Sequence, residues 1–257
     1  MLRFSTGLRN FIAKYGSIAD ALQNGCIEIY TGGQPSTPDA APTGTLLCTI
    51  SNAGNGYGGE SQATGTVSLT AGTAGSVSSI TVNGVEVMGA TINYDTSLSQ
   101  TATDIAAQIN TFESFPDYYA VANGPSVTIY AMPGVAAAAN GYAVVATASG
   151  GITATTTAMS GGVPATNGLK LGAPAAGSIP QQTNQVWSGT NGASGTAGWF
   201  RQYGGIADNH QTDSLGIALR MDGAIGTAGA EMNLSNTSFA SGAVTTLAAW
   251  LMTVPGQ

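Results

Sequence analysis

Charged side chains are scarce in this sequence of 257 residues. Asp, Glu, Lys and Arg make up 7% of it, whereas about a quarter is usual for a soluble protein. Only 6 residues are basic against 13 acidic ones, so the formal net charge is −7. A nucleic-acid groove needs clustered Lys and Arg to displace counterions from phosphates. The composition therefore argues against a nucleic-acid partner.

Long apolar runs are also missing. No stretch approaches the roughly 18 apolar residues of a membrane-spanning helix, so we expect no membrane insertion. The opening MLRFSTGLRNFIAKYG has basic side chains but no continuous apolar segment, which indicates a short docking helix rather than a secretory signal. Glycine (37 residues) and hydrophobic residues (43%) are abundant. They indicate a folded, turn-rich β protein whose surface is partly covered by copies of itself.

Cysteine is represented only by Cys26 and Cys48, too few for a disulfide framework. They lie in two apolar runs that we expect to pair as antiparallel strands, with the two cysteines roughly opposite each other. A disulfide between them is one possibility. Two buried thiols that act as small hydrophobic side chains are the simpler interpretation.

No catalytic group of residues can be assembled from the sequence. The single histidine, His210, lies near Asp208 and Asp213, and the three could bind a divalent cation. Zinc sites need three or four ligands at fixed spacing, so a solvated loop is the simpler interpretation. There is no G-x-S-x-G elbow and no G-x-x-x-x-G-K-[ST] loop, and the five glutamates lie in different elements. We expect no enzyme and no cofactor.

Periodic patterns divide the chain into three parts. Residues 1–55 indicate two short helices and the strands 26–31 and 45–51. Residues 56–165 combine a hairpin at Asn83-Gly84, one amphipathic helix and four further strand-like runs, which is typical of a small α+β domain. Residues 166–257 return to short strands at close spacing, and Asp222-Gly223 indicates a turn between two of them.

The first part holds too few strands to form a sheet alone, so we expect its strand pair to complete the sheet of residues 166–257. Residues 56–165 are then an insertion, which exposed loop tips tolerate. The predicted fold is mainly β. It has a β-sandwich or barrel-like outer domain built from both chain ends and a small inserted α+β domain, a sheet with one helix.

Aromatic residues gather in the closing part of the chain. Alternation along SGTAGWFRQYGG puts Trp199, Arg201 and Tyr203 on one side of a strand and Phe200 on the other. Arg201, one of few cations, is expected to pair with a carboxylate of this chain or of a neighbouring copy. The candidate core or interface residues are Trp187, Trp199, Arg201, Tyr203 and Trp250.

Some of these aromatic residues could also bind a ligand or another subunit. Trp187, Trp199 and Tyr203 could stack on sugar rings if they were coplanar and exposed to solvent. Trp250 lies in the most apolar tract, TLAAWLMTVP, which suits either a final core strand or a contact between subunits.

Both chain ends resemble a family of tailed-bacteriophage virion structural proteins, in which a short helical lead precedes an I-x-I-Y-[ST]-G-x-Q-P strand and turn. The likeness covers GLRNFIAKYGSIADALQNGCIEIYTGGQPSTPDAAPTGTLLCTI at the start, and NGLKLGAPAAGSI, VWSGTNGASGTAGWFRQYG and RMDGAIGTAGAEMNLSNTSFASGAVTTL near the end. The segment from ITVNGVEVMG to TAMSGG resembles a small module found in various phage structural proteins.

The resemblance implies a structural part of the virion that is assembled in the bacterial host cytoplasm, with copies of itself and other virion proteins as partners. A tail-associated place (tail tip, baseplate or fibre attachment) is favoured, and a head-associated capsid decoration protein is the alternative. A carbohydrate-binding module that recognises a host-surface glycan is the second alternative. No functional residue carries over, because the likeness rests on turns and core strands.

Overall fold

The computed structural model describes residues 1–253, and the chain divides into two compact units. Residues 1–59 and 165–253 form the outer unit, and Glu60–Pro164 forms the inserted unit. The sequence patterns place these limits at 55/56 and 165/166. Strands hold 41% of the residues and helices 13%, which confirms a mainly β chain.

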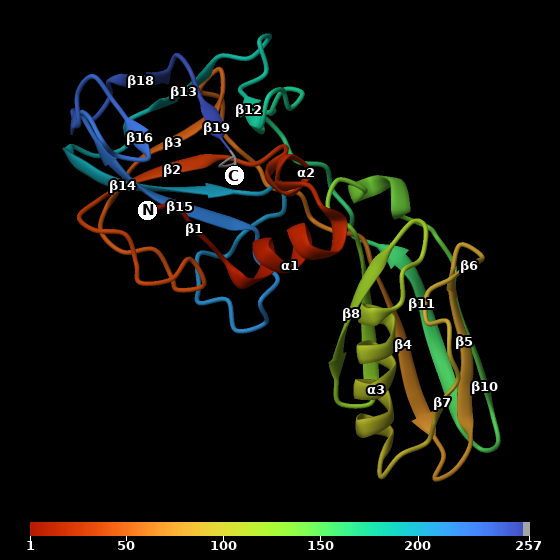
Figure 1. The fold of residues 1–257 in the computed structure, drawn as a ribbon. Coiled ribbons are helices and arrows are strands. Elements are labelled where there is room, and N and C mark those ends of the chain that lie inside the picture. The colour runs from red at the N-terminus through yellow and green to blue at the C-terminus, as the bar shows by residue number, and fades with distance from the viewer. Residues whose placement is uncertain (254–257) are drawn as a thin grey trace. The chain divides into compact units, whose positions relative to one another are not determined.

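The outer unit is built on a nine-stranded sheet with the order β1-β15-β14-β2-β3-β13-β18. Figure 1 shows the early strands β2 and β3, in red and orange, beside the late strands β14 and β15 in blue. Both chain ends therefore share one sheet, as the sequence predicted. The strands of its main path are β1 (Arg3–Phe4), β2 (Ile27–Thr31), β3 (Leu46–Asn52), β13 (Trp187–Thr190), β14 (Gly195–Tyr203), β15 (Arg220–Gly226) and β18 (Val244–Leu247).

Shorter elements complete the outer unit. β16 (Met232–Asn233) pairs with β15, and β17 (Ser238–Phe239) pairs with β14. β12 (Ser178–Pro180) and β19 (Leu251–Thr253) form a separate two-stranded sheet whose side chains join the same apolar core. Within the described residues, no sheet closes on itself.

Two helices open the chain where the sequence expects them. α1 (Thr6–Tyr15) begins at Ser5, whose hydroxyl accepts a hydrogen bond from the Leu8 amide, and it ends at Gly16, which has φ 76°. A hydroxyl at the N-cap satisfies one of the free amides of the first turn, and glycine adopts the left-handed conformation at low cost. α2 (Ile18–Leu22) follows directly, with Ser17 as its N-cap.

Two expectations about the outer unit are wrong. Asp222-Gly223 is not a turn but lies inside β15, where Asp222 pairs with Arg201 across the sheet. Cys26 and Cys48 are not opposite each other, because Cys48 faces Ile29 in the ladder of β2 and β3, and both thiols are free. A β-bulge between Ile29 and Tyr30 shifts the register by one residue before the loop, where the Thr31 amide bonds to the Thr45 carbonyl.

The inserted unit packs one long helix and two sheets around its own apolar core. One sheet has the strand order β11-β4-β9-β8, and the other has the order β10-β5-β6 with β7 paired to β5. The sequence predicted one sheet in this unit, whereas the structure has two. Residues Asn83 and Gly84 have φ 49° and 81°, which confirms the tight hairpin. The elements are β4 (Thr64–Ala71), β5 (Ser76–Val82), β6 (Val85–Glu86), β7 (Ile92–Asn93), α3 (Leu98–Thr111), β8 (Tyr118–Asn123), β9 (Ser126–Ala131), η1 (Ala136–Ala139), β10 (Val144–Ser149) and β11 (Thr153–Ser160).

Candidate functional site

The main sheet of the outer unit is buried on both faces, and the two faces differ in chemistry. Phe200 of β14 points into the apolar core, where its ring meets Trp250 edge-on with 5.4 Å between the ring centroids. On the opposite face lie alternate residues of β2, β14 and β15, covered by the loops 32–45 and 204–219. We call this face the polar layer. It consists of Glu28, Tyr30, Trp199, Arg201, Tyr203, Arg220 and Asp222, with Asp208 and His210 from the second loop.

Arg201 and Asp222 form the centre of the polar layer. Nε of Arg201 lies 2.7 Å from Oδ1 of Asp222, and Nη2 lies 2.8 Å from Oδ2, so the guanidinium grips the carboxylate through two parallel hydrogen bonds. Both side chains are 0% exposed. Burial raises the pKa of Asp222, and the hydrogen bonds and charge of Arg201 oppose that shift. The expectation that Arg201 pairs with a carboxylate is confirmed within this chain.

Arg220 ties both covering loops to the sheet. Its Nε and Nη2 lie 2.7 and 2.8 Å from the carboxylate of Asp208. Nη2 also donates to the Gln211 carbonyl (2.8 Å), and Nη1 donates to the Pro38 carbonyl (3.2 Å). Because Asp208 and Gln211 belong to one loop and Pro38 to the other, a single buried guanidinium holds three segments together.

A second set of contacts fixes the first covering loop over β14. Nη1 of Arg201 donates to the Ala40 carbonyl at 2.9 Å, and the Trp199 indole donates to the Thr43 carbonyl at 3.3 Å. The Trp199 ring also stacks on Tyr30, with 4.6 Å between centroids. The two loops join where the Asp213 amide donates to the Asp39 carbonyl at 2.7 Å.

His210 lies at the solvent edge of the polar layer. Its Nε2 is 3.3 Å from Oε2 of Glu28, and the same carboxylate accepts a hydrogen bond from the Tyr30 hydroxyl. Burial, together with the nearby Glu28 charge, raises the pKa values of Tyr30 and Tyr203 far above the usual range of tyrosine. Both hydroxyls therefore stay protonated and cannot act as bases near neutral pH.

The suggested cation ligands do not come together. Among residues 1–253, no group of three His, Cys, Asp or Glu side chains is arranged to hold a metal ion. Asp208 faces Arg220, and His210 faces Glu28. Asp213 accepts hydrogen bonds from three backbone amides of its own loop, at residues 215, 216 and 218. The contacts of Asp208 and His210 bind the loop to the sheet, and those of Asp213 hold the loop's own backbone.

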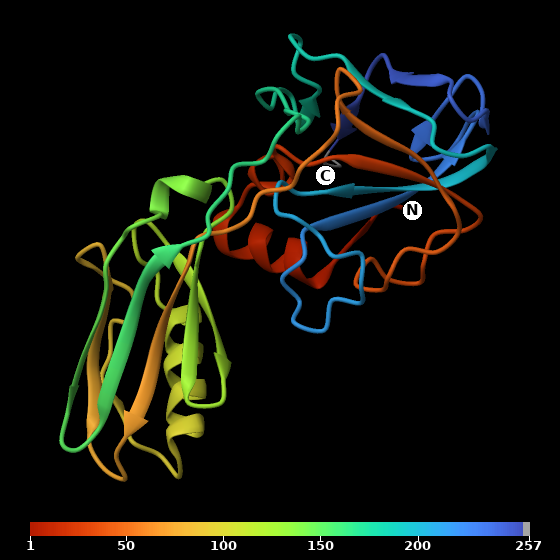
Figure 2. The ribbon, with the colours of Figure 1, turned by 180° about the vertical axis from the view of Figure 1, so that it is seen from behind.

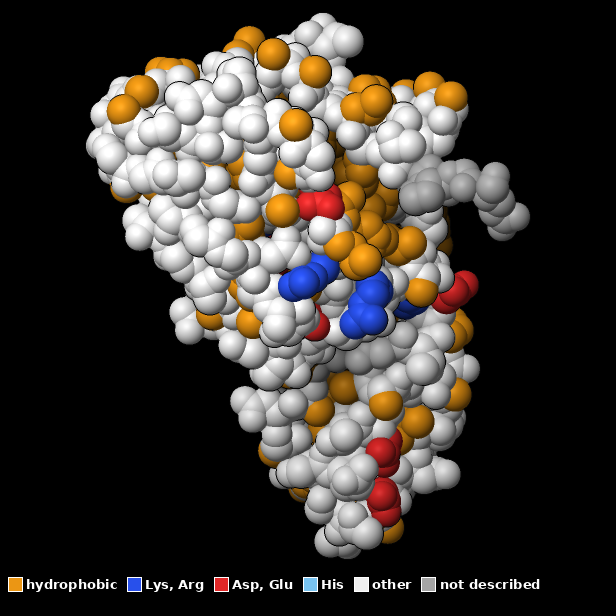
Figure 3. Space-filling view, turned by 60° about the vertical axis from the view of Figure 1, so that its left-hand side comes forward, with side chains coloured by type: hydrophobic (Ala, Val, Ile, Leu, Met, Phe, Trp, Pro, Cys, Tyr) orange, Lys and Arg blue, Asp and Glu red, His pale blue; other side chains and the backbone are white. Residues whose placement is uncertain are grey.

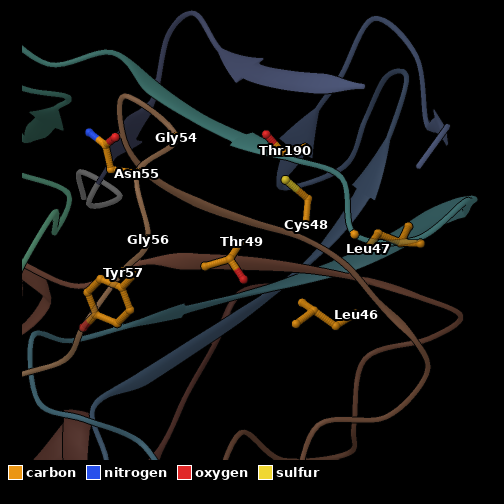
Figure 4. A pocket seen from close by; sticks show the side chains of 10 residues that line it. Leu46, Leu47, Cys48, Thr49, Gly54, Asn55, Gly56, Tyr57 and Thr190 are labelled. Carbon is orange, nitrogen blue, oxygen red and sulfur yellow. The ribbon is translucent and has the colours of Figure 1, made fainter. Parts of the chain in front are cut away.

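A shallow cavity of about 250 Å³ lies beside β3 in the outer unit. Figure 4 shows the sulfur of Cys48 pointing toward Thr190 at its rim. Burial raises the pKa of Cys48 to about 11, so its thiol stays protonated and is a poor nucleophile near neutral pH. The cavity has no charged side chain in its lining, which consists of Leu46, Leu47, Cys48, Thr49, Gly54, Asn55, Gly56, Tyr57, Thr190 and Gly192.

The aromatic residues singled out from the sequence are all internal. Trp187 and Trp199 are 0% exposed and Tyr203 is 2% exposed, so they form no solvent-facing platform, and the suggestion that they stack on sugar rings is wrong. Trp187 and Trp250 belong to the apolar core, whereas Trp199 and Tyr203 lie in the polar layer. Alternation in CIEIYTG and LRMDGAIG could also have found Glu28, Arg220 and Asp222, since every second residue shares a face.

Comparison with known proteins identifies no relative. No family model, no curated protein and no solved structure matches this chain. Among the helices of the described residues, none has the length and apolar character needed to cross a membrane.

Proposed function

We propose that this chain is a non-enzymatic structural component of a tailed-bacteriophage virion, placed at the tail and assembled as a homo-oligomer in the host cytoplasm. The likeness of both chain ends to a virion family supports this proposal. The segments that carry the likeness include β2 and β3 at the start and β13, β14 and β15 near the end, and these strands are neighbours in one sheet. The likeness thus follows a structural unit rather than scattered sequence.

We also propose that the outer unit is a β-sandwich-like domain. The strands β12 and β19 contribute Ile179 and Met252 to the apolar core that also holds Phe200 of the main sheet. Two sheets that share one core are the basis of a sandwich.

An uncharged edge of the main sheet is the observation that supports the proposed homo-oligomer. Within the described residues β18 pairs only with β13 and is the last strand of the sheet. Val244 on β18 is 68% exposed. An edge strand without charges offers free backbone groups to another chain, and closed symmetry is usual for such assemblies.

The use of charge supports the same proposal. Arg201 and Arg220 are buried in the fold, where they form ion pairs with Asp222 and Asp208. The face seen in Figure 3 has only small groups of blue and red atoms among white and orange ones. A free protein usually keeps a more highly charged surface for solubility, so a surface this poor in charge suits a protein covered by neighbours.

Labelled antibody on intact virions tests the location. We expect label at the tail. Label over the head would replace the tail assignment with that of a decoration protein, and label at neither place would refute the virion role.

Light scattering on the purified protein tests self-assembly. We expect a defined oligomer that the edge substitution Val244→Lys weakens. The matched control is Val145→Lys on β10, where the native side chain is 53% exposed. A monomer for the unaltered chain, or equal effects of the two substitutions, would contradict assembly through this edge.

A further inference from the structure

The outer face of the sheet β11-β4-β9-β8 in the inserted unit is covered with hydroxyl groups. Alternate residues of each strand turn inward to the apolar core, for example Val67 and Leu69 of β4 and Val127 and Ile129 of β9. The residues between them turn outward. We call these the hydroxyl face: Thr153, Thr155 and Thr157 of β11; Thr64, Thr66, Ser68 and Thr70 of β4; Ser126, Thr128 and Tyr130 of β9; and Tyr119, Val121 and Asn123 of β8.

The strand register arranges these hydroxyls in straight rows across the sheet. One row runs through Thr157, Thr66 and Thr128, and the next through Thr155, Ser68 and Ser126. Neighbouring strands lie about 4.8 Å apart and successive outward residues about 7 Å apart. The rows thus form a regular grid of hydrogen-bonding groups on β4 and its neighbours, strands that can be followed in Figure 2.

The hydroxyls keep hydrogen-bonding capacity for a ligand. Cross-strand pairs form at Thr66–Thr157 (2.9 Å), Ser68–Ser126 (2.8 Å) and Thr70–Thr153 (2.9 Å). Each hydroxyl has one donor and two acceptor sites, so the Ser68–Ser126 pair retains a donor and lone pairs. The Thr157 hydroxyl also accepts from the Thr66 amide (3.0 Å), and the Thr70 hydroxyl also donates to the Thr153 carbonyl (3.4 Å), so these two pairs offer mainly lone pairs. The hydroxyls of Thr128 and Thr155 have no hydrogen-bond partner in the described part of the chain. The face can therefore both donate to and accept from a partner.

An aromatic pair closes one end of the grid. Tyr119 and Tyr130 stack with 4.7 Å between ring centroids and 5° between ring planes. The Tyr119 hydroxyl is held by Gln62 at 2.7 Å, which fixes the pair in place. Half-buried tyrosines of this kind combine an apolar ring with a polar tip.

The charge of the inserted unit limits which partner fits this face. Residues 60–164 contain six carboxylates and no Lys, Arg or His, and none of the carboxylates belongs to the hydroxyl face. A phosphate-rich or acidic partner would be repelled and would find no cation to pair with. A protein interface would need an apolar centre rich in aromatic residues, Met or Arg, whereas Val121 is the one aliphatic side chain of this face.

A high strand propensity explains why threonine is frequent here, and the low charge of the whole chain, 7%, accounts for a face without charge. What distinguishes this face is the ordered rows of hydroxyls beside a stacked tyrosine pair. A partner that complements these groups must itself be uncharged, must carry many hydroxyls that donate and accept, and must offer some apolar surface to the tyrosines. A neutral polysaccharide has all three properties.

We propose that the hydroxyl face of the inserted unit binds a neutral glycan. The sugar hydroxyls bond to the threonine and serine rows, and an apolar sugar face packs on the Tyr119–Tyr130 pair. A single exposed face of neutral groups binds weakly, at roughly millimolar Kd, and several copies in one assembly would raise the avidity. This inference stands apart from the virion proposal, because it rests only on residues of the inserted unit.

Affinity electrophoresis of the full chain tests this inference. Native gels carry dissolved dextran, laminarin or mannan as neutral probes and heparin as the anionic probe. We expect at least one neutral polysaccharide to retard the protein and heparin to leave it unaffected. Failure of all three neutral probes and of a wider neutral-glycan array, or retardation by heparin alone, would overturn the proposal.

A matched pair of variants locates the binding. Thr128→Val with Thr155→Val removes two unpartnered hydroxyls and keeps the side-chain shape. We expect about tenfold weaker retardation, since each lost neutral hydrogen bond changes affinity by roughly two- to tenfold. The control is Thr156→Val with Thr196→Val, two exposed strand threonines outside the face, which should bind as the unaltered chain does.

Two further measurements keep the test decisive. Circular dichroism and melting curves must match among the variants, because a misfolded face would lose binding for another reason. Light scattering shows whether the face instead joins two copies. Equal glycan binding by both variants, or a change in molecular mass without a change in glycan binding, would refute the proposal.

Discussion

Replacement of Asp222 by Ala leaves the Arg201 guanidinium buried without the carboxylate that it grips at 2.7 and 2.8 Å. Both side chains are 0% exposed, so the guanidinium has no access to bulk solvent in place of the lost partner. Breaking a buried pair in this way costs about 3–5 kcal/mol. At roughly 2–4 °C per kcal/mol for a domain of this size, the Tm of the outer unit should fall by roughly 6–20 °C.

Urea unfolding followed by circular dichroism, together with scanning calorimetry, measures this loss of stability. The control is Asp20→Asn, which changes an exposed carboxylate in the same unit and should cost less than about 1 kcal/mol. The double variant Arg201→Met with Asp222→Leu removes both charges and should recover much of the stability, because apolar residues replace buried ion pairs well. A loss for Asp222→Ala no larger than that of the control would refute the buried pair.

Three further predictions concern other parts of the fold. Arg220→Lys keeps the charge but loses the paired hydrogen bonds of the guanidinium, so we expect the free energy of unfolding to fall by about 1–3 kcal/mol. Backbone amides of residues 206–217 should then exchange hydrogen faster, and unchanged exchange there would contradict this prediction. Burial raises the pKa of Cys48 to about 11, so both cysteines should resist a thiol reagent at pH 8 until urea unfolds the chain, and early reaction would contradict their burial. Burial raises the pKa of Glu86, but hydrogen bonds from Ser79 and backbone amides outweigh it and hold the pKa below the usual 4.5. That stabilisation is present above pH 4.5 and is lost as the pH falls below it, so Glu86→Gln should flatten the acid dependence of the melting temperature of the inserted unit, and an unaltered acid dependence would contradict it.

Strand pairing in the outer unit was predictable because it depends on patterns that the sequence shows directly. Alternating apolar residues mark both early strands, and neither can bury its apolar side without the later sheet. The sequence also predicts that Arg201 pairs with a carboxylate, since a cation on a strand of buried aromatic residues needs an opposite charge. Its identity was not predictable, because Asp222 lies 21 residues away in a segment that resembles a turn.

Local signals failed where a distant contact decides the structure. Asp-Gly favours turns, yet Gly223 lies inside β15, where a Cβ atom would come within 2.6 Å of the Phe200 ring. Glycine is required there by close packing rather than by a turn. The prediction that the two cysteines lie opposite each other was wrong as well. The ladder of β2 and β3 places Cys48 opposite Ile29 and contains a β-bulge between Ile29 and Tyr30, which no periodicity reveals.

Asp208, His210 and Asp213, the candidate cation ligands, have structural roles. Asp208 pairs with Arg220 and His210 lies against Glu28, and these contacts hold a long loop against the sheet, whereas Asp213 accepts hydrogen bonds from amides of its own loop. A chain with only 6 cationic residues that buries two arginines in this way leaves few charges for recognition. Binding surfaces in such a protein must then depend on uncharged groups, which is why the hydroxyl face, rather than the polar layer, is where a ligand should be sought.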